Sequence, residues 1–194
     1  MNIKKRDFPM FLNRMADMPV NKVKGIVFHH TAGNPMATMA GINNWHIDGR
    51  GWAGVGYHFG INAEGTIYEG RPLTKEGVHA RRPANGETWA VALFGNFENY
   101  APTPSQVESA NRLYWYLKEK RPTAAPSEHK DHGNTLCAGK YFNLDEIIKP
   151  LPVENDLFYR VVTGSFQDRD NALNRVQELK NVGFDSFITT FKKD

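Results

Sequence analysis

The stretch that decides the fold is residues 23–29, VKGIVFH, in a chain of 194 residues. A short apolar run rich in β-branched residues, bounded by polar ones, predicts a buried strand. The strand ends at His29, where a side chain is held rigidly at the edge of the sheet. Neighbouring strand residues point to opposite faces, so His29 and the following His30 cannot both face one site.

Further elements are expected on both sides of this strand. They are a helix that begins at Asn34-Pro35 and carries Met36, Met39, Ile42 and Trp45 on its apolar face, a hairpin of residues 55–61 and 66–69, and a buried strand at 90–95. A second helix is predicted over residues 104–120, because Thr103 and Gln106 form a capping box around Pro104. Strands separated by helices indicate an α/β fold with a mixed central sheet flanked by helices.

Composition excludes several classes of protein. There are 24 Lys and Arg against 21 Asp and Glu, a net charge of +3, which is too mild to indicate a nucleic-acid partner. No run of about 18 apolar residues is present, so we expect no membrane insertion. A single cysteine, Cys137, excludes an internal disulfide and must be a free thiol or a metal ligand.

The C-terminal part reads as a separate small module. Prolines and acidic residues predict a linker at 150–157, after a main domain over 1–149 and before a module over 158–194. Within the module we expect a strand at 158–164, a helix capped by Asp168 and ended by Gly183, and a strand at 184–191. Two strands and one helix are barely stable alone, so the module is expected to pack on the main domain or on a second copy.

Metal-binding chemistry is the first candidate function. A catalytic zinc takes three protein ligands and leaves a fourth position open. The candidates are the seven histidines and Cys137. His29 ends a strand, and His129 and Cys137 lie eight residues apart in a short loop that can fold both donors onto one ion. The spacing alone leaves the ligand set open.

Four segments in order resemble the zinc-dependent N-acetylmuramoyl-L-alanine amidases of the amidase-2 group, which are related to the peptidoglycan recognition proteins. They are VFHHTAG at 27–33, GVGYHF at 54–59, VALFGNF at 91–97, and HKD at 129–131 with TLCAG at 135–139. The resemblance covers roughly residues 20–148. It implies Zn²⁺ held by His29, His129 and Cys137, with His29 preferred to His30.

The resemblance also implies roles for other residues. Tyr57 would orient the attacking water or the scissile carbonyl, Thr135 would stabilise the oxyanion, and His79 would line the substrate groove. Leu136 and Ala138 stand where the family has Asp and Pro, which removes no donor but alters the loop. Separately, Trp52 and Trp89 lie in predicted polar loops, where they are candidates to stack on sugar.

The tail resembles the first half of a SPOR peptidoglycan-binding domain, through FYRVVTGSF at 158–166 and the helix that follows. The complete domain has two such halves. Two chains that pair their tails would rebuild the full sheet, so a homodimer through this module is expected, with docking on the chain's own amidase domain as the alternative.

The expected function is therefore a zinc amidase that cuts peptidoglycan between N-acetylmuramic acid and L-alanine. The basic N-terminus at 1–6 is not followed by an apolar core, so no secretion signal is read. This favours a phage or prophage endolysin that stays in the cytoplasm until lysis and then acts on the cell wall. The alternatives are a non-catalytic peptidoglycan-binding module and a cytoplasmic amidase acting on soluble anhydro-muropeptides.

Overall fold

The computed structural model describes residues 2–151, 164–184 and 186–190. The chain divides into two compact units, Met1–Pro152 and Val153–Asp194, and each is described by itself. The expected boundary at 150–157 spans the point of division.

A six-stranded sheet forms the centre of the first unit, in the order β1-β4-β3-β5-β2-β6. The strands are β1 (Ile3–Lys4), β2 (Gly25–His30), β3 (Phe59–Ile61), β4 (Ile67–Glu69), β5 (Thr88–Leu93) and β6 (Ala125–Glu128). Only β3 and β4 pair antiparallel, and the other four pairs are parallel. This confirms the mixed α/β sheet that the sequence predicts.

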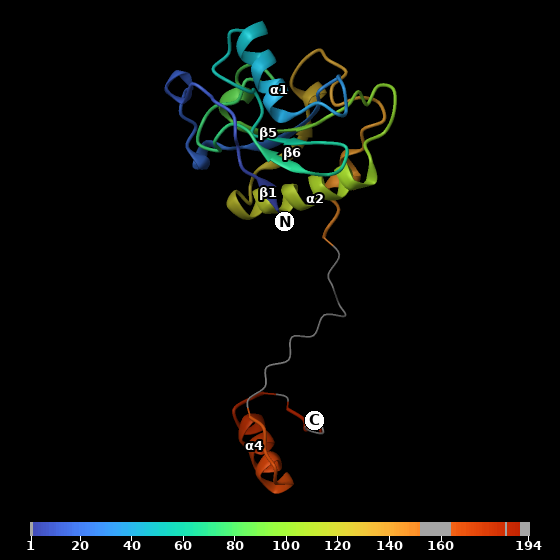
Figure 1. The fold of residues 1–194 in the computed structure, drawn as a ribbon. Coiled ribbons are helices and arrows are strands. Elements are labelled where there is room, and N and C mark those ends of the chain that lie inside the picture. Colours follow the sequence, from blue (N-terminus) through green and yellow to red (C-terminus); the bar gives the residue numbers. More distant parts are fainter. Residues whose placement is uncertain (1, 152–163, 185, 191–194) are drawn as a thin grey trace. The chain divides into compact units, whose positions relative to one another are not determined.

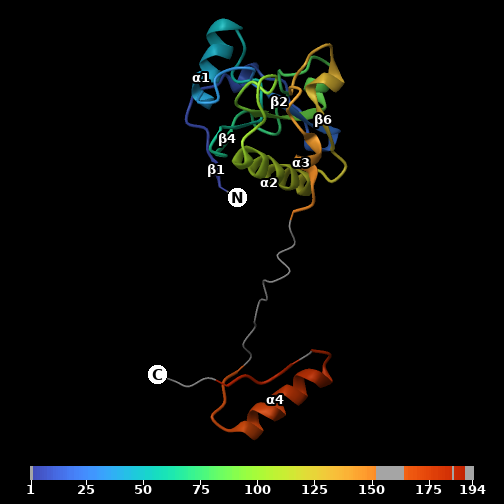
Figure 2. The same cartoon turned by 90° about the vertical axis from the view of Figure 1, so that its right-hand side faces the viewer.

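The two faces of β2 differ in what they contact. All six residues of β2 are buried, as expected for a central parallel strand. Ile26 and Phe28 pack into the main core with Leu113 and Leu117 of helix α2 (Pro104–Lys120). Helix α2 lies along this side of the sheet, and α1 lies on the other side (Figures 1 and 2). We call these sides the core face and the site face.

Helix α2 follows its sequence signals. Thr103 Oγ1 accepts a hydrogen bond from the backbone N–H of Gln106, and Gln106 Oε1 accepts one from the N–H of Thr103. The capping box therefore forms as predicted. Gln106 is itself buried, and its side-chain amide is satisfied there because it also donates to the carbonyl oxygens of Ile61 and Phe94.

Helix α1 (Met39–Asn44) starts later than predicted. Its N-cap is Thr38, whose hydroxyl accepts from the N–H of Gly41, and the chain continues through a π-helical turn, η3 (Trp45–Gly49). The Asn34 side chain instead accepts from the N–H of Met36 in a local turn, which competes with helix formation. Met36 and Trp45 are exposed, so the predicted apolar face is wrong at both positions.

The remaining elements of the first unit are short. They are the 3₁₀ turns η1 (Leu12–Arg14), η2 (Val20–Lys22), η4 (Ala84–Gly86) and η5 (His129–His132), and helix α3 (Leu144–Ile148). The predicted hairpin is present, but its first strand begins at Phe59 rather than at residue 55.

The second unit contains helix α4 (Arg169–Asn181). Asp168 caps it by accepting from the N–H groups of Asp170 and Asn171, and Gly183 follows its end at a φ of 89°, as predicted. The expected strand at 158–164 lies outside the described residues except for Gly164. The described residues of 184–191 form no strand, so that expectation is wrong for them; a strand needs a hydrogen-bonded partner.

Among the described residues, none of the helices combines the length and the apolar character needed to cross a bilayer.

Candidate metal centre

The site face of the sheet carries His29 at the carboxyl end of β2. His29 is only 1% exposed, and its ring lies near those of His129, His79 and Tyr57. His30 points the other way, and its Nδ1 accepts a hydrogen bond from the N–H of Phe97 on the core face. The alternation of the strand therefore separates the two histidines, and His29 is the one that enters the site.

His29, His129 and Cys137 converge on one point. One donor atom from each residue lies within 4.8 Å of the other two. His129 opens η5, directly after β6, the neighbour of β2 in the sheet. The loop closes back on itself because the N–H of Lys130 donates to the carbonyl oxygen of Cys137 at 2.6 Å. In the described part of the chain this is the one group of His, Cys, Asp or Glu donors with such spacing.

The donor set fits zinc. His29 Nδ1 and Cys137 Sγ are 3.7 Å apart. A tetrahedral zinc, with bonds of about 2.0–2.1 Å to nitrogen and about 2.3 Å to sulfur, places such a pair roughly 3.5 Å apart. Two imidazoles and one thiolate also leave the fourth position that a catalytic site needs.

Electrostatics keep the two imidazoles neutral, which is the form that binds metal. Burial lowers the pKa of His29 well below its usual range, and the nearby His79 and His129 lower it further. Burial likewise lowers the pKa of His129. Burial raises the pKa of the Cys137 thiol to about 12, so a cation is needed to hold this group as a thiolate.

Tyr57 and Thr135 lie beside these donors. The ring centroid of Tyr57 is 5.3 Å from that of His29. Burial, and next the proximity of Cys137, raise the pKa of Tyr57 above its usual range, so its hydroxyl keeps its proton. Thr135 Oγ1 accepts from the N–H of Cys137 at 3.3 Å, which ties this hydroxyl to the ligand loop.

His79 contacts a donor residue directly, which the sequence did not indicate. Its Nδ1 is 3.0 Å from His29 Nε2. The two histidines are 50 positions apart in the sequence, so no local pattern predicts this contact. His58, by contrast, is fully buried and bonded to the backbone of Lys75 and Ala90, as a structural histidine is.

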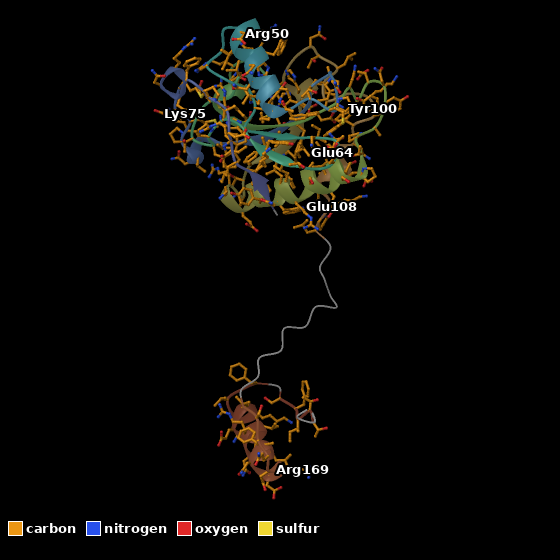
Figure 3. The ribbon with its side chains drawn as sticks, viewed as in Figure 1. Arg50, Glu64, Lys75, Tyr100, Glu108 and Arg169 are labelled. Atoms are coloured by element: carbon orange, nitrogen blue, oxygen red, sulfur yellow. The ribbon has the colours of Figure 1, made fainter. Side chains whose placement is uncertain are left out.

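The two tryptophans proposed to stack on sugar differ. Trp89 is fully buried on the core face of β5, and its indole N–H donates to the carbonyl oxygen of Leu73, so that prediction is wrong. Trp52 is partly exposed beside a hollow of about 330 Å³ and packs on the His46 ring. Arg50, labelled in Figure 3, directly follows η3, and its guanidinium carbon lies 5.9 Å from the centroid of the Trp52 ring.

A family model described as N-acetylmuramoyl-L-alanine amidase, Amidase_2, matches residues 19–140. The chain belongs to this amidase family. Its matched region contains the three convergent donors together with Tyr57, His79 and Thr135. A second model, the SPOR domain, matches residues 138–190 and so begins inside the first unit.

Relatives of this amidase-family chain include both recognition proteins and an amidase. Peptidoglycan-recognition protein SC2 of Drosophila melanogaster is 35% identical over 129 residues, covering 61% of this chain and 70% of the relative. The solved structure of N-acetylmuramoyl-L-alanine amidase LysC from Clostridium intestinale is 35% identical, with a TM-score of 0.67 over 76% of this chain and 95% of LysC. Drosophila peptidoglycan recognition protein SD, at 23% identity and a TM-score of 0.69, shares the fold.

Proposed function

We propose that this chain is a zinc-dependent peptidoglycan amidase that hydrolyses the bond between the lactyl group of N-acetylmuramic acid and L-alanine. The observation that carries the proposal is the convergence of His29, His129 and Cys137 within 4.8 Å on the site face. Family membership and the 35% identity to LysC, an N-acetylmuramoyl-L-alanine amidase of known structure, support the choice of substrate.

The three donors would hold the metal and leave an open position toward the substrate. When bound, zinc supplies a Lewis acid that polarises the scissile carbonyl and lowers the pKa of water toward neutrality. The end of β2 at His29 and the short loop between His129 and Cys137 hold the three donors close together. This preorganisation lowers the cost of building the site when the ion binds.

Tyr57 and Thr135 would act on the amide itself. Because its pKa is raised, the Tyr57 hydroxyl stays protonated at neutral pH and can donate a hydrogen bond to the developing oxyanion. The Thr135 hydroxyl accepts from Cys137 N–H, so its own proton is free to point at the same oxygen. Both residues therefore serve better as donors than as general bases.

The reaction adds water to the lactyl carbonyl carbon and breaks the carbon–nitrogen bond. Both protons of the water end on the departing amine, so L-alanine leaves with a free α-ammonium group, and the lactyl group stays on the sugar as a carboxylate. The sugar chain stays intact, which distinguishes this cleavage from that of a glycosidase.

A purely binding role is the main alternative, because several relatives are named as recognition proteins. The presence of Cys137 beside the two histidines favours catalysis, since a binder has no need for a complete donor set. A cytoplasmic amidase that acts on soluble anhydro-muropeptides has the same chemistry and differs only in substrate.

The biological setting that fits these features is an endolysin, cytoplasmic until lysis, that uses its C-terminal module on the cell wall. The 35% identity between this chain and LysCS, an endolysin amidase of known structure from Clostridium intestinale, supports this setting. The SPOR match supports wall binding by the tail. We also propose that two tails pair; a monomer in sedimentation at high concentration, with α4 folded, would exclude pairing.

Product analysis on purified peptidoglycan tests the proposal. With zinc present we expect new N-terminal alanine without new reducing sugar ends, and loss of that release after chelation. Zinc binding without cleavage would favour the recognition module. Activity on soluble fragments alone would favour the cytoplasmic amidase, and reducing ends would contradict the amidase assignment.

A further inference from the structure

A line of hydrogen-bonding groups runs from the buried strand β5 to the candidate metal centre. Thr88 Oγ1 lies 2.7 Å from the carbonyl oxygen of Ala84 and 3.4 Å from His79 Nε2. His79 Nδ1 lies 3.0 Å from His29 Nε2, and His29 Nδ1 lies 3.7 Å from Cys137 Sγ. Each ring thus uses one nitrogen toward β5 and the other toward the metal donors.

The donor and the acceptor at each of these contacts follow from counting the available protons. A hydroxyl has one proton, and a carbonyl oxygen can only accept, so Thr88 donates to Ala84 and must accept from His79. His79 Nε2 therefore carries a proton. A neutral imidazole then has a lone pair on Nδ1, and this atom must accept from His29 Nε2. His29 is left with its lone pair on Nδ1, the atom that faces Cys137.

Burial shields the contacts of this line from solvent, since His29 is only 1% exposed. Thr88 is only 5% exposed, so water does not compete freely for its hydroxyl.

The local chain is shaped to hold the His79 ring in this position. Asn85 Oδ1 accepts from the N–H groups of His79 and Ala80 at 2.8 and 2.9 Å, which fixes the backbone on both sides. Gly77 gives the ring room, because a Cβ at this position would lie 2.4 Å from His79 Cδ2. Lys75, labelled in Figure 3, lies two residues before Gly77, and its carbonyl oxygen lies 2.9 Å from His58 Nε2.

We propose that His79 and Thr88 are positioning residues that lock His29 in its Nε2-protonated tautomer and so present Nδ1 to the metal. His79 then acts through His29, as an outer partner of a ligand, and not by touching peptidoglycan. The inference rests on the proposed metal site, and it goes beyond that site by assigning the proton on each ring. Outer partners of this kind typically change metal affinity by about 10–100-fold when lost.

We call the contacts from Thr88 through His79 to His29 the relay. Two readouts test it in the full-length chain. The first is the tautomer of His29 in the metal-free protein, read from its two ring ¹⁵N shifts by long-range ¹H–¹⁵N NMR. The second is zinc affinity by competition with a chromophoric chelator. For the wild type we expect protonation at His29 Nε2 only.

Matched variants separate positioning from folding. His79→Phe keeps a buried ring but removes the acceptor, and should weaken zinc binding by about 10–100-fold and mix the tautomers of His29. His79→Gln offers a carbonyl oxygen to His29 and should recover most of the affinity. Thr88→Val should weaken zinc binding less than His79→Phe, whereas Thr88→Ser should match the wild type.

The outcomes are distinct. Unchanged zinc affinity and an unchanged His29 tautomer in folded His79→Phe and Thr88→Val would overturn the relay. Protonation at His29 Nδ1 in the wild type would also overturn it. A wild type that binds no zinc would refute the proposed metal centre, and the NMR tautomer would still decide the relay.

Discussion

The two faces of strand β2 carry opposite kinds of side chain although they share one backbone. Phe28 on the core face is fully buried among apolar rings, including Tyr114 and Phe142. His29 on the site face is as deeply buried but is surrounded by His79, His129 and Tyr57. One face stabilises the fold through packing, and the other uses that rigidity to hold polar groups away from water. Substitutions on the two faces should therefore affect different measurements.

The largest difference between the two faces is expected when each of two neighbouring residues on β2 is substituted in turn. His29→Gln removes a metal donor and should abolish zinc binding and amide hydrolysis while the chain stays folded. His30→Gln, on the other face, should keep zinc affinity and lose only some stability, since His30 bonds the N–H of Phe97. Competition with a chelator measures the zinc affinity of both variants, and urea unfolding measures their stability. Equal zinc affinities for both variants would contradict the assignment of faces.

A cavity in the core face should cost stability. Phe28→Ala removes a fully buried ring and should lower the free energy of unfolding by about 3–5 kcal/mol. Met36→Ala is the control, because Met36 is 66% exposed and its loss should change that free energy by less than about 0.5 kcal/mol. Chemical denaturation measures both, and similar losses would show that Phe28 is not in the main core.

A hydroxyl on each face allows a matched test of catalysis. Tyr57→Phe removes the proposed oxyanion donor and should lower kcat by about 10²–10³ with little change in zinc affinity. Tyr114→Phe removes a hydroxyl from α2 on the core face and should leave kcat unchanged. Equal kcat values for Tyr57→Phe and the wild type would remove Tyr57 from the mechanism.

The sequence predicts some features of the two faces and not others. Strand β2 and the capping box of α2 follow from neighbours within a few residues, so local patterns predicted both. The polar residues that flank Trp89 predict a loop, whereas β5 begins at Thr88 and buries the indole completely. The contact between His79 and His29 depends on a loop 50 residues away and on the space beside Gly77, which no local pattern encodes.

Acid should destabilise the first unit through two buried histidines. Burial lowers the pKa of His46 and of His58 to about 4, against about 6.5 in the unfolded chain. Below about pH 6.5 the unfolded chain therefore binds more protons than the folded one, so stability is lost as the pH falls toward 4. For His58, which is fully buried, the shift corresponds to on the order of 3 kcal/mol.

Urea unfolding of the metal-free chain at several pH values measures this loss. His58→Gln should flatten part of the slope between pH 6.5 and 4, even if the variant is less stable at neutral pH. A free energy of unfolding that stays constant over this range would contradict the neutral, buried state of His46 and His58.

The smallest expected effect lies at the start of α2. Thr103→Ala removes the hydroxyl that caps Gln106 N–H and should lower the free energy of unfolding by about 1 kcal/mol. Thr103→Ser keeps the cap and serves as its control. Because α2 covers the core face, neither variant should change zinc affinity, and a change would show that the two faces are coupled.

X-ray absorption at the zinc edge of the loaded, full-length protein tests the metal centre most directly. The expected spectrum has one sulfur at about 2.3 Å and two imidazole nitrogens at about 2.0–2.1 Å, completed by an oxygen. Cys137→Ser should remove the sulfur shell and leave the imidazoles. A wild-type spectrum without sulfur, or with oxygen ligands alone, would contradict a centre built from His29, His129 and Cys137.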